Sequence, residues 1–533
     1  MKLYAGARFF TPDLGADAEA MLVDGENIRY LGSLREAQLI APDAEVIELD
    51  GATVLPGFVD GHAHVLMTGE ASLQVDLWGA NTLDEIQRRV GEWALAHPDE
   101  PRILAQGWNH SAIPATAPTR EMLDAVVADR PVYATAYDYH SIWLNSAALA
   151  ELGIDRATVA PAGGTITTDA AGEPTGYIDE TALQQLIWPR MEALASDEQR
   201  QVSLAAALAA YRSTGVTAAT DMATGEVDLT VLSEAERSGE LTLRVRAFWR
   251  VDCYEDLQQS LQQVQRAIEL AGQVRSELFR VVGIKLFLDG TVDGCTAALG
   301  APYANGQQPG PIWSQEALNT VVTMADAAGL QVAMHAIGDE AVRLGIAAIE
   351  QAIRANGPCA RRHRIEHLEV VDRVDLERLA AIGITASMQP VHADPAIQRN
   401  WRAMLGDHRI ERGYPWRDVE HSGARLVFGT DSPTSPHPPL RNMYVAATRA
   451  SALDPEMEPN VPEQAVPLRD AVVHASADAA WACRSEQEFG QLAEGLRADF
   501  IVLDRDVFSG PADELLAAQV LRTVVGGREV YRA

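Results

Sequence analysis

The hydrophobic pattern of the chain changes character after residue 196. From there on, short apolar runs of strand length alternate with longer segments in which apolar residues recur at helical spacing. This alternation is typical of βα units that build a parallel sheet. The apolar runs lie at residues 216–222, 243–251, 281–288, 330–335, 363–368, 384–389 and 426–429.

An eighth apolar run, at residues 54–62, precedes this region. Eight parallel strands with intervening helices are what a closed (β/α)8 barrel of the TIM type requires, and active sites on that fold lie where the strands end, at the carboxyl face. We therefore predict an α/β chain with a barrel over residues 54–485. We expect its chemistry at the carboxyl ends of these strands.

Both ends of the chain carry short strand patterns that are too small to bury a core alone. Residues 1–53 contain two strands joined across Asp24-Gly25, a dipeptide that favours hairpins. Residues 486–533 contain strand patterns at 499–503, 520–525 and 529–531, with a Gly526-Gly527 turn between the last two. We predict that the two ends pair as one discontinuous β-sandwich beside the barrel.

A long insertion, residues 70–195, interrupts the alternation after the first barrel strand. It contains a predicted helix at residues 81–96 and several aromatic clusters. A loop at this position of a barrel lies over the mouth of the active site, so we expect the insertion to select the substrate.

The composition argues against several classes of protein. Lysine and arginine total 43 residues against 75 Asp and Glu, which gives a formal net charge of -32. Such a surface repels phosphate backbones and anionic lipid headgroups, so we expect neither a nucleic-acid partner nor a membrane partner. The four cysteines lie far apart without a C-x-x-C pair, and no apolar signal segment develops at the amino terminus. We therefore expect a cytoplasmic protein.

Two strands carry side chains that suit a metal ion. His62 and His64 project from the same face of the first barrel strand, because alternate residues of a strand point the same way, and neutral imidazole binds zinc and other divalent metals. Lys285 shares a face of the fourth strand with Phe287 and Asp289, so it points into the barrel. An unpaired buried ammonium is costly. Lys285 therefore either pairs with a carboxylate or acts, deprotonated or carbamylated, as a ligand.

Three further strands end on residues of ligand type: His335 on the fifth, His367 on the sixth and Asp431 on the eighth. Each has a structural interpretation of its own, as a barrel-core histidine, a surface residue beside two glutamates, and a turn residue before Pro433. Singly, these interpretations are the better ones. Jointly, they require six coincidences at the same end of one barrel, so the sequence predicts a metal site.

The order His-x-His, Lys, His, His, Asp on strands one, four, five, six and eight resembles the binuclear metal-dependent amidohydrolase superfamily. Several further phrases resemble its YtcJ-like branch, amidohydrolase family 3, which includes N-substituted formamide deformylase. These phrases are LPGFVDGHAH at 55–64, HSIWLNSAAL at 140–149, GEPTG at 172–176, QPVH at 389–392 and GTDSP at 429–433.

The resemblance implies a site with two divalent ions, zinc first, with manganese or iron as alternatives. It implies that His62, His64 and Asp431 bind the more buried ion, that His335 and His367 bind the more exposed ion, and that Lys285 bridges the two as its carbamate. A carbamate offers one oxygen to each of two cations. An activated water between the ions would be the nucleophile.

The same resemblance implies a hydrolase that cleaves the amide-type C–N bond of a small N-acyl or N-formyl amine, with Asp431 as ligand and proton shuttle. The alternatives are a deaminase or lactonase of the superfamily, and a regulator that retains metal without catalysis. Lys285 argues against the mononuclear deaminases, which usually lack a lysine on strand four. Family members often form dimers, so a homodimer is one expectation.

Three residues are candidates for substrate contacts. His140 lies in one of the family-like phrases, and Trp108 lies in Gly-Trp-Asn, where relatives carry Asp in place of Asn109. His392, just past the seventh strand, is placed to donate a hydrogen bond to a substrate oxygen. Aromatic packing is the structural alternative for Trp108, and pairing with Asp394 is the alternative for His392.

Overall fold

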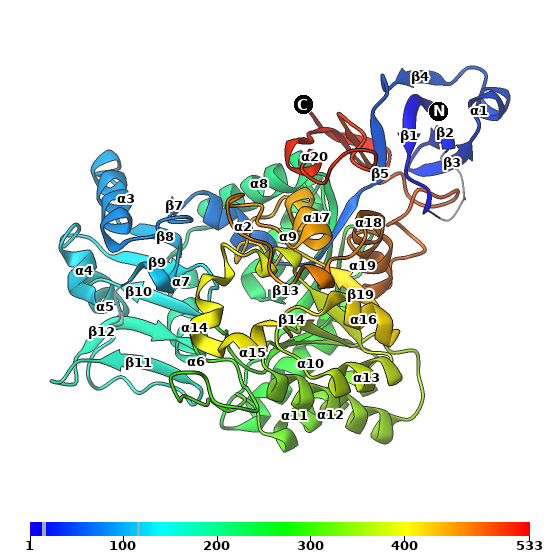
Figure 1. The fold of residues 1–533 in the computed structure, drawn as a ribbon. Helices are drawn as coiled ribbons and strands as arrows, with labels where there is room; N and C mark the ends of the chain where they lie inside the picture. Colours follow the sequence, from blue (N-terminus) through cyan, green and yellow to red (C-terminus); the bar gives the residue numbers. More distant parts are fainter. Residues whose placement is uncertain (13–17, 114–117) are drawn as a thin grey trace.

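Eight parallel strands form the centre of the molecule, as predicted from the sequence (Figure 1). The computed structural model describes residues 1–12, 18–113 and 118–533. Each barrel strand pairs in parallel with the next one along the chain. The strands are β6 (Phe58–Ala63), β13 (Val216–Thr224), β14 (Arg244–Arg250), β15 (Phe279–Phe287), β16 (Gln331–Ala336), β17 (Arg364–His367), β18 (Thr385–Met388) and β19 (Leu426–Phe428).

The last strand of the barrel meets the first at two glycines. Just past β19, the Asp431 N–H donates to the His62 carbonyl at 2.6 Å. A Cβ on Gly61 would lie 2.6 Å from the Phe428 carbonyl oxygen, and a Cβ on Gly429 would lie 2.3 Å from the His62 nitrogen. Only glycine permits so close an approach. Closure therefore brings the end of β6 beside the residues that follow β19.

The first predicted barrel strand, residues 54–62, is two strands in different sheets, so that prediction was wrong. β5 (Thr53–Pro56) pairs antiparallel with β20 (Phe500–Leu503), and β6 joins the barrel. Gly57 separates them, and a Cβ there would lie 2.2 Å from Thr217 Oγ1. Both strands are buried, and an unbroken apolar run does not mark where a buried chain changes sheet.

Helices cover the outside of the barrel. α8 (Asp197–Ser213) begins with a capping box between Ser196 and Gln199. α12 (Asp339–Asn356) buries Val342, Ile346 and Ile349 at helical spacing. The other helices of this region are α2 (Val65–Ser72), α9 (Glu226–Ser238), α10 (Leu257–Gln273), α11 (Gln315–Ala327), α13 (Arg373–Ala381), α16 (Trp416–Ser422), α17 (Pro439–Thr448), α18 (Leu468–His474) and α19 (Ala477–Ala482), with the short turn η6 (Pro462–Gln464). Within the described ranges, no helix has the combined length and apolar character that crossing a bilayer demands.

The two ends of the chain share one sheet, in the order β22-β21-β20-β5-β1-β2-β3, with β4 on β1. Both predicted hairpins are present, as the β2–β3 and β21–β22 pairs. The rings of Tyr4 and Phe500 meet edge to face, 4.9 Å apart, so the core of this sheet draws on both ends. Figure 1 shows the two termini on the same side of the barrel. The remaining elements are β1 (Lys2–Phe9), β2 (Ala18–Asp24), β3 (Asn27–Gly32), α1 (Leu34–Ile40), β4 (Glu45–Glu48), α20 (Glu514–Ala517), β21 (Val520–Val525) and β22 (Arg528–Arg532).

The insertion forms a separate six-stranded sheet, which the sequence did not predict. Its order is β11-β12-β10-β9-β8-β7. In Figure 1 it lies across the barrel from the terminal sheet. The predicted helix is α3, and residues 114–117 of the insertion lie outside the described part. The elements are β7 (Val75–Asp76), α3 (Leu83–Ala96), β8 (Ile103–Trp108), η2 (His110–Ala112), α4 (Arg120–Asp124), β9 (Val132–Ala136), β10 (Ser141–Leu144), α5 (Ser146–Leu152), β11 (Gly164–Thr168), β12 (Pro174–Asp179), α6 (Glu180–Ala182), η3 (Leu183–Ile187) and α7 (Trp188–Leu194).

Two long loops also lie at the carboxyl face of the barrel. Residues 288–314 follow β15 without helix or strand. After β18 the chain forms four short helical segments, η4 (Pro390–Ala393), η5 (Gln398–Asn400), α14 (Trp401–Leu405) and α15 (Asp407–Ile410). The Ala304 N–H donates to the Met404 carbonyl at 2.8 Å, which ties the first loop to the second.

A buried ion pair joins the terminal sheet to the barrel. Arg244, in β14, donates to the two oxygens of Asp499, just before β20, at 2.6 and 3.1 Å. Both side chains are 1% exposed. Removal of one partner from such a pair leaves a buried charge without compensation.

We expect Asp499→Ala to lower the free energy of unfolding by about 3–5 kcal/mol, because among the described residues Arg244 would retain only the partly exposed Glu277 as an ionic partner. Urea or thermal unfolding measures this change. Glu92→Ala is the matched control, since it breaks an exposed pair with Arg88 on α3 and should cost less than about 1 kcal/mol. Equal losses in the two variants would contradict a structural role for the buried pair.

Candidate metal centre

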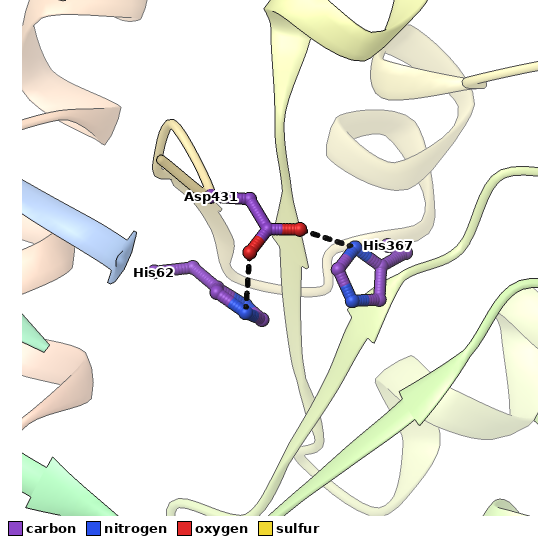
Figure 2. A group of neighbouring side chains, drawn as sticks. All are labelled: His62, His367 and Asp431. Atoms are coloured by element: carbon purple, nitrogen blue, oxygen red, sulfur yellow. Dashed lines mark ion pairs between the residues drawn. The ribbon is translucent and has the colours of Figure 1, made fainter. Parts of the chain in front are cut away.

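The six side chains predicted as metal ligands meet at the carboxyl end of the barrel. His62 lies in β6 and His64 directly after it, Lys285, His335 and His367 lie near the ends of β15, β16 and β17, and Asp431 follows β19. Figure 2 shows the His62 and His367 rings on two sides of the Asp431 carboxylate. Ligand atoms of these three residues all lie within 4.8 Å of one another.

Asp431 is the common neighbour of four imidazoles, three from predicted ligands and the fourth from His392. Its Oδ1 lies 3.2 Å from His62 Nε2 and 3.1 Å from His64 Nε2, and its Oδ2 lies 3.9 Å from His367 Nδ1. The ring of His335 lies 4.5 Å from that of His367, centroid to centroid. The predicted histidines and Asp431 therefore form one continuous cluster.

The backbone is strained at two of these positions. His367 has φ of 76° and Asp431 has φ of 58°, the left-handed region that side chains with a Cβ rarely adopt. Non-glycine residues keep such a conformation only where the surrounding structure fixes it, and they concentrate at functional sites. The two strained residues lie within contact distance of each other in the cluster.

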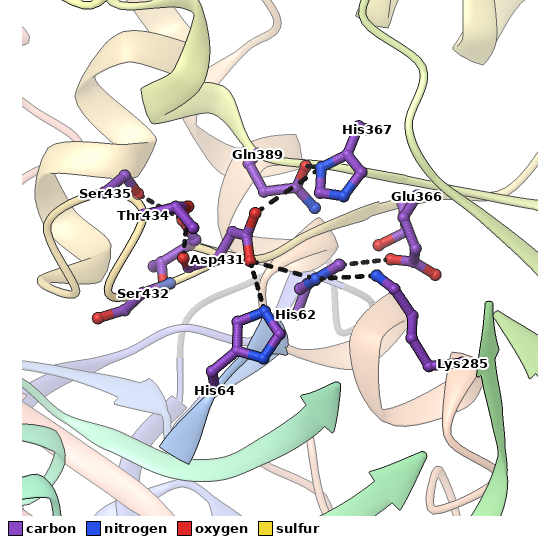
Figure 3. A network of polar contacts seen from close by, with 12 residues as sticks. His62, His64, Lys285, Glu366, His367, Gln389, Asp431, Ser432, Thr434 and Ser435 are labelled. Atoms are coloured by element: carbon purple, nitrogen blue, oxygen red, sulfur yellow. Dashed lines mark hydrogen bonds and ion pairs between the residues drawn. The ribbon is translucent and has the colours of Figure 1, made fainter. Parts of the chain in front are cut away.

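Hydrogen bonds determine which nitrogen of each imidazole is free. His62 Nδ1 lies 2.7 Å from Glu366 Oε2, and His367 Nδ1 lies 2.8 Å from Gln389 Oε1 (Figure 3). His335 Nε2 lies 3.2 Å from the Gly290 carbonyl. Because these oxygens only accept, the named nitrogens carry the proton, and the second nitrogen of each ring keeps a lone pair. Outer partners of this kind orient the histidines that bind metals.

Lys285 points into the same cluster, with its Nζ 3.4 Å from His62 Nε2 (Figure 3). Burial lowers the pKa of Lys285 to about 8, although the Glu366 and Asp431 carboxylates act in the opposite direction. Lys285 and Lys2 are the only lysines in the sequence, which otherwise uses arginine for its cations. An amine, unlike a guanidinium, can become neutral near physiological pH.

The electrostatics of the cluster suit a divalent cation. Burial and neighbouring positive groups hold the pKa of His335 and of His367 well below the usual value, which favours neutral rings. Burial would raise the pKa of Asp431, but the imidazoles around it hold the pKa well below its usual value. Asp431 Oδ1 is buried and accepts no hydrogen bond from the described residues. A buried carboxylate with imidazole rings grouped around it is a donor set that zinc and similar ions prefer.

A second carboxylate, Asp60, holds the two halves of the cluster in place. It accepts hydrogen bonds from the Thr430 N–H at 2.8 Å and hydroxyl at 2.5 Å, and from the His62 N–H at 3.2 Å. It thus joins the end of β6 to the residues before Asp431. Its place two residues before His62, in the same phrase, was the signal that the sequence analysis left unused.

A cavity opens beside the cluster and encloses about 430 Å³ of empty space, counting the part open to solvent. Its walls come from the insertion, from the loop after β15 and from the segments after β18. The residues that line it are Tyr137, Asp138, His140, Thr291, Val292, Asp293, His335, Ile337, His367, Glu369, His392, Ile397, Trp401, Tyr414, Asp431 and Thr434. A concave space beside a cluster of ligand-type side chains is the default place for a small molecule to bind.

Two of the three candidate substrate contacts line this cavity. His140 pairs with Glu180 at 2.9 Å, and this carboxylate outweighs burial and raises the pKa of His140 to about 9. His392 lies 3.3 Å from Glu369 and 3.2 Å from the Thr434 hydroxyl, so its partner is not Asp394. 

Trp108 is placed differently. It lies in β8 within the core of the insertion, its side chain is fully buried, and its N–H donates to the Ala134 carbonyl at 2.9 Å. It is absent from the described cavity lining, and Tyr137 faces the cavity instead.

The sequence analysis also missed Glu366, Asp293 and Glu369. Glu366 is next to His367 in the chain and orients His62 across the barrel. Asp293 and Glu369 follow the ends of strands β15 and β17 by six and two residues. Their position past a strand end was the available signal, but it does not tell which loop residues turn inward.

Comparison with known proteins agrees with this geometry. The model of the Amidohydrolase family matches residues 45–531. The putative amidohydrolase YtcJ of Bacillus subtilis (strain 168) is 31% identical, covering 97% of this chain and 96% of its own, and the N-substituted formamide deformylase of Arthrobacter pascens is 28% identical, covering 96% and 94%. A crystal structure of an uncharacterized metal-dependent hydrolase from Pyrococcus furiosus superposes with a TM-score of 0.74 at 27% identity, covering 95% and 100%. A family match that spans the whole barrel and the insertion, with relatives that align along nearly their whole length, makes this chain a member of the Amidohydrolase family.

Proposed function

We propose that this protein is a metal-dependent hydrolase that cleaves the amide C–N bond of a small N-acyl or N-formyl amine. The observation that carries the proposal is the group of imidazoles around Asp431, which borders a cavity walled by the insertion and by two loops. The likeness to an N-substituted formamide deformylase supports cleavage of a C–N bond.

The donor set supports two divalent ions, with zinc first and manganese or iron as alternatives. His62, His64 and Asp431 would hold one ion, and His335 and His367 would hold the other, with Lys285 between them. The neutral amine of Lys285 can add to carbon dioxide and lose one proton, and the resulting carbamate offers two oxygens. When bound, ions of this kind polarise a carbonyl group and acidify water, which is the chemistry that hydrolysis of an amide needs.

Asp431 carries the proton in this proposal. Its Oδ1 faces His62 and His64, whereas its Oδ2 lies 3.8 Å from His392 Nε2, on the cavity side. Oδ2 accepts a proton from the attacking water and delivers it to the leaving nitrogen as the C–N bond breaks, so the product amine departs neutral.

His392 and His140 position the substrate. Glu369 fixes the His392 ring and, against the effect of burial, raises the pKa of His392, so this imidazole can donate a hydrogen bond from Nε2 to a substrate oxygen. His140 packs against His335, with ring centroids 4.9 Å apart, and closes the insertion side of the site.

Metal content and turnover test the proposal together. Protein purified without chelator should contain about two divalent ions per chain by plasma mass spectrometry, and it should hydrolyse members of a panel of N-formyl and N-acyl amines. Removal of the ions by a chelator should abolish turnover, and added zinc or manganese should restore it. Turnover of lactones or aminated heterocycles with none of the amides would move the assignment to a lactonase or deaminase. Metal binding without turnover on any panel would favour a regulator.

Glu366→Gln is expected to weaken metal binding by about 10- to 100-fold, because Glu366 orients His62 and makes its ring more basic. Titration against a metal-sensitive chelating dye measures this affinity. Glu350→Gln, which removes a partly exposed carboxylate that pairs with Arg378, is the control and should leave the affinity unchanged. An unchanged affinity in Glu366→Gln would show that His62 does not depend on this partner.

A further inference from the structure

Asp293 is a buried carboxylate of the cavity wall that has an unused oxygen. It is 8% exposed and lies in the loop after β15. Its Oδ2 accepts a short hydrogen bond from the Tyr137 hydroxyl. Its Oδ1 is buried and makes no hydrogen bond with the described part of the chain. A buried carboxylate oxygen without a donor is costly, and in a native protein it calls for an explanation, such as a water molecule, an ion or a bound ligand that supplies the donor.

The other carboxylates that line the cavity have imidazole partners. Asp138 lies 3.7 Å from His110 Nε2, Glu369 lies 3.3 Å from His392 Nδ1, and Asp431 faces the cluster histidines. Within the described ranges, Asp293 has no cationic side chain within 4 Å. Among the carboxyl groups of the lining, Asp293 is therefore the one that has no cationic side chain of the described structure at close range.

The surroundings of Asp293 favour a guest cation. Burial raises the pKa of Asp293 to about 7, with Asp138 and Glu369 acting in the same direction and Tyr137 and His110 in the opposite direction. A cation in the cavity would therefore find a carboxyl group that ionises readily on its approach.

Aromatic side chains line the same space. Tyr137, Tyr414 and Trp401 all face the cavity, and the rings of the last two are stacked with their centroids 5.0 Å apart. The face of an aromatic ring attracts an ammonium or guanidinium group as well as apolar groups. This wall suits an alkyl chain that ends in a cation.

We propose that the amide substrate carries an ammonium group away from the scissile bond, and that Asp293 binds this group. The proposal rests on the proposed amide hydrolysis and narrows its substrate class to amides of diamines and similar cationic amines. Asp293 Oδ1 receives the ammonium N–H while Oδ2 keeps the Tyr137 hydroxyl. Asp293 is then the specificity-determining residue of the cavity.

A matched series of substrates tests the proposal. Acetamides and formamides of α,ω-diamines with two to six methylene groups are compared with the N-alkyl amides of equal length, in which a methyl group replaces the ammonium. We expect kcat/KM to favour one cationic member over its neutral counterpart by about 10- to 100-fold, the ratio expected of a charge-assisted hydrogen bond in a buried site. In Asp293→Asn this preference should disappear, because kcat/KM for the cationic amide should fall by more than kcat/KM for the neutral amide.

Two further variants serve as controls for the role of the Asp293 charge. Asp293→Glu retains the charge and should retain part of the preference. Glu316→Gln removes an exposed charge on α11, and it should leave the preference intact, which excludes a general effect of the acidic surface. The melting temperature of each variant establishes that it is folded. A wild-type enzyme that hydrolyses neutral amides as well as cationic ones would overturn the inference and leave the proposed hydrolase intact.

Calorimetric measurement of n-butylammonium binding tests the cation site at Asp293 independently of turnover. The wild-type protein should bind this cation more tightly than butan-1-ol, and Asp293→Asn should lose the difference. If no amide is hydrolysed, the proposed function fails, and Asp293-dependent binding of the cation would still support the cation site. Equal binding by the wild type and Asp293→Asn would overturn it.

Discussion

Asp431→Asn is expected to lower the rate of hydrolysis by at least about 10²- to 10⁴-fold while the protein keeps its fold, because a general base is lost. Asparagine has nearly the same shape as aspartate and can fill the same space, but its amide cannot take up a proton. It also offers a neutral oxygen to His62 and His64, so some metal affinity should be lost as well.

Rate constants under metal saturation separate these two effects. At saturating metal, any remaining loss of kcat reports the proton transfer, and the thermal melting curve reports the fold. Asp470→Asn makes the same chemical change on an exposed position of α18 and should leave kcat unaltered. Near-normal kcat in Asp431→Asn would remove Asp431 from the role of proton carrier.

Lys285→Ala should reduce the metal content from about two ions per chain toward one. It should lower activity by at least about 10²-fold, which is the largest loss typical when a residue that only orients a metal ligand is replaced. The reason is that the buried amine, whose pKa lies near 8, is the group placed to bridge the two halves of the cluster. Short carboxylates such as formate or acetate should restore part of the metal content and part of the activity, because they supply two oxygens to the same space.

Labelled carbon dioxide provides a direct check of the bridge. With only two lysines in the chain, ¹³C-bicarbonate should give one protected carbamate resonance, which disappears in Lys285→Ala and persists in Lys2→Ala. Full metal occupancy in Lys285→Ala, with no carbamate signal in the wild type, would make Lys285 a charge partner of Glu366 and Asp431.

The sequence by itself determined the barrel and the residues at its carboxyl face. Strand periods, helical periods and hairpin dipeptides are local signals, so β13 to β19 and the Asp24-Gly25 hairpin could be predicted closely. His62, His64 and Asp431 could be placed together because parallel strands of a barrel end at the same face. Once the strands are assigned, the convergence of their last residues follows from topology.

Only the tertiary structure decided the contacts between residues far apart in the chain. The change of sheet at Gly57 and the six-stranded sheet of the insertion depend on which strands pair, and apolar runs do not encode their partners. Glu366 reaches His62 across 304 positions, and Tyr137 reaches Asp293 across 156. Packing also decided that Trp108 is buried in the insertion whereas Tyr137 faces the cavity. The free energy of such contacts depends on burial and geometry, which exist only after the chain has folded.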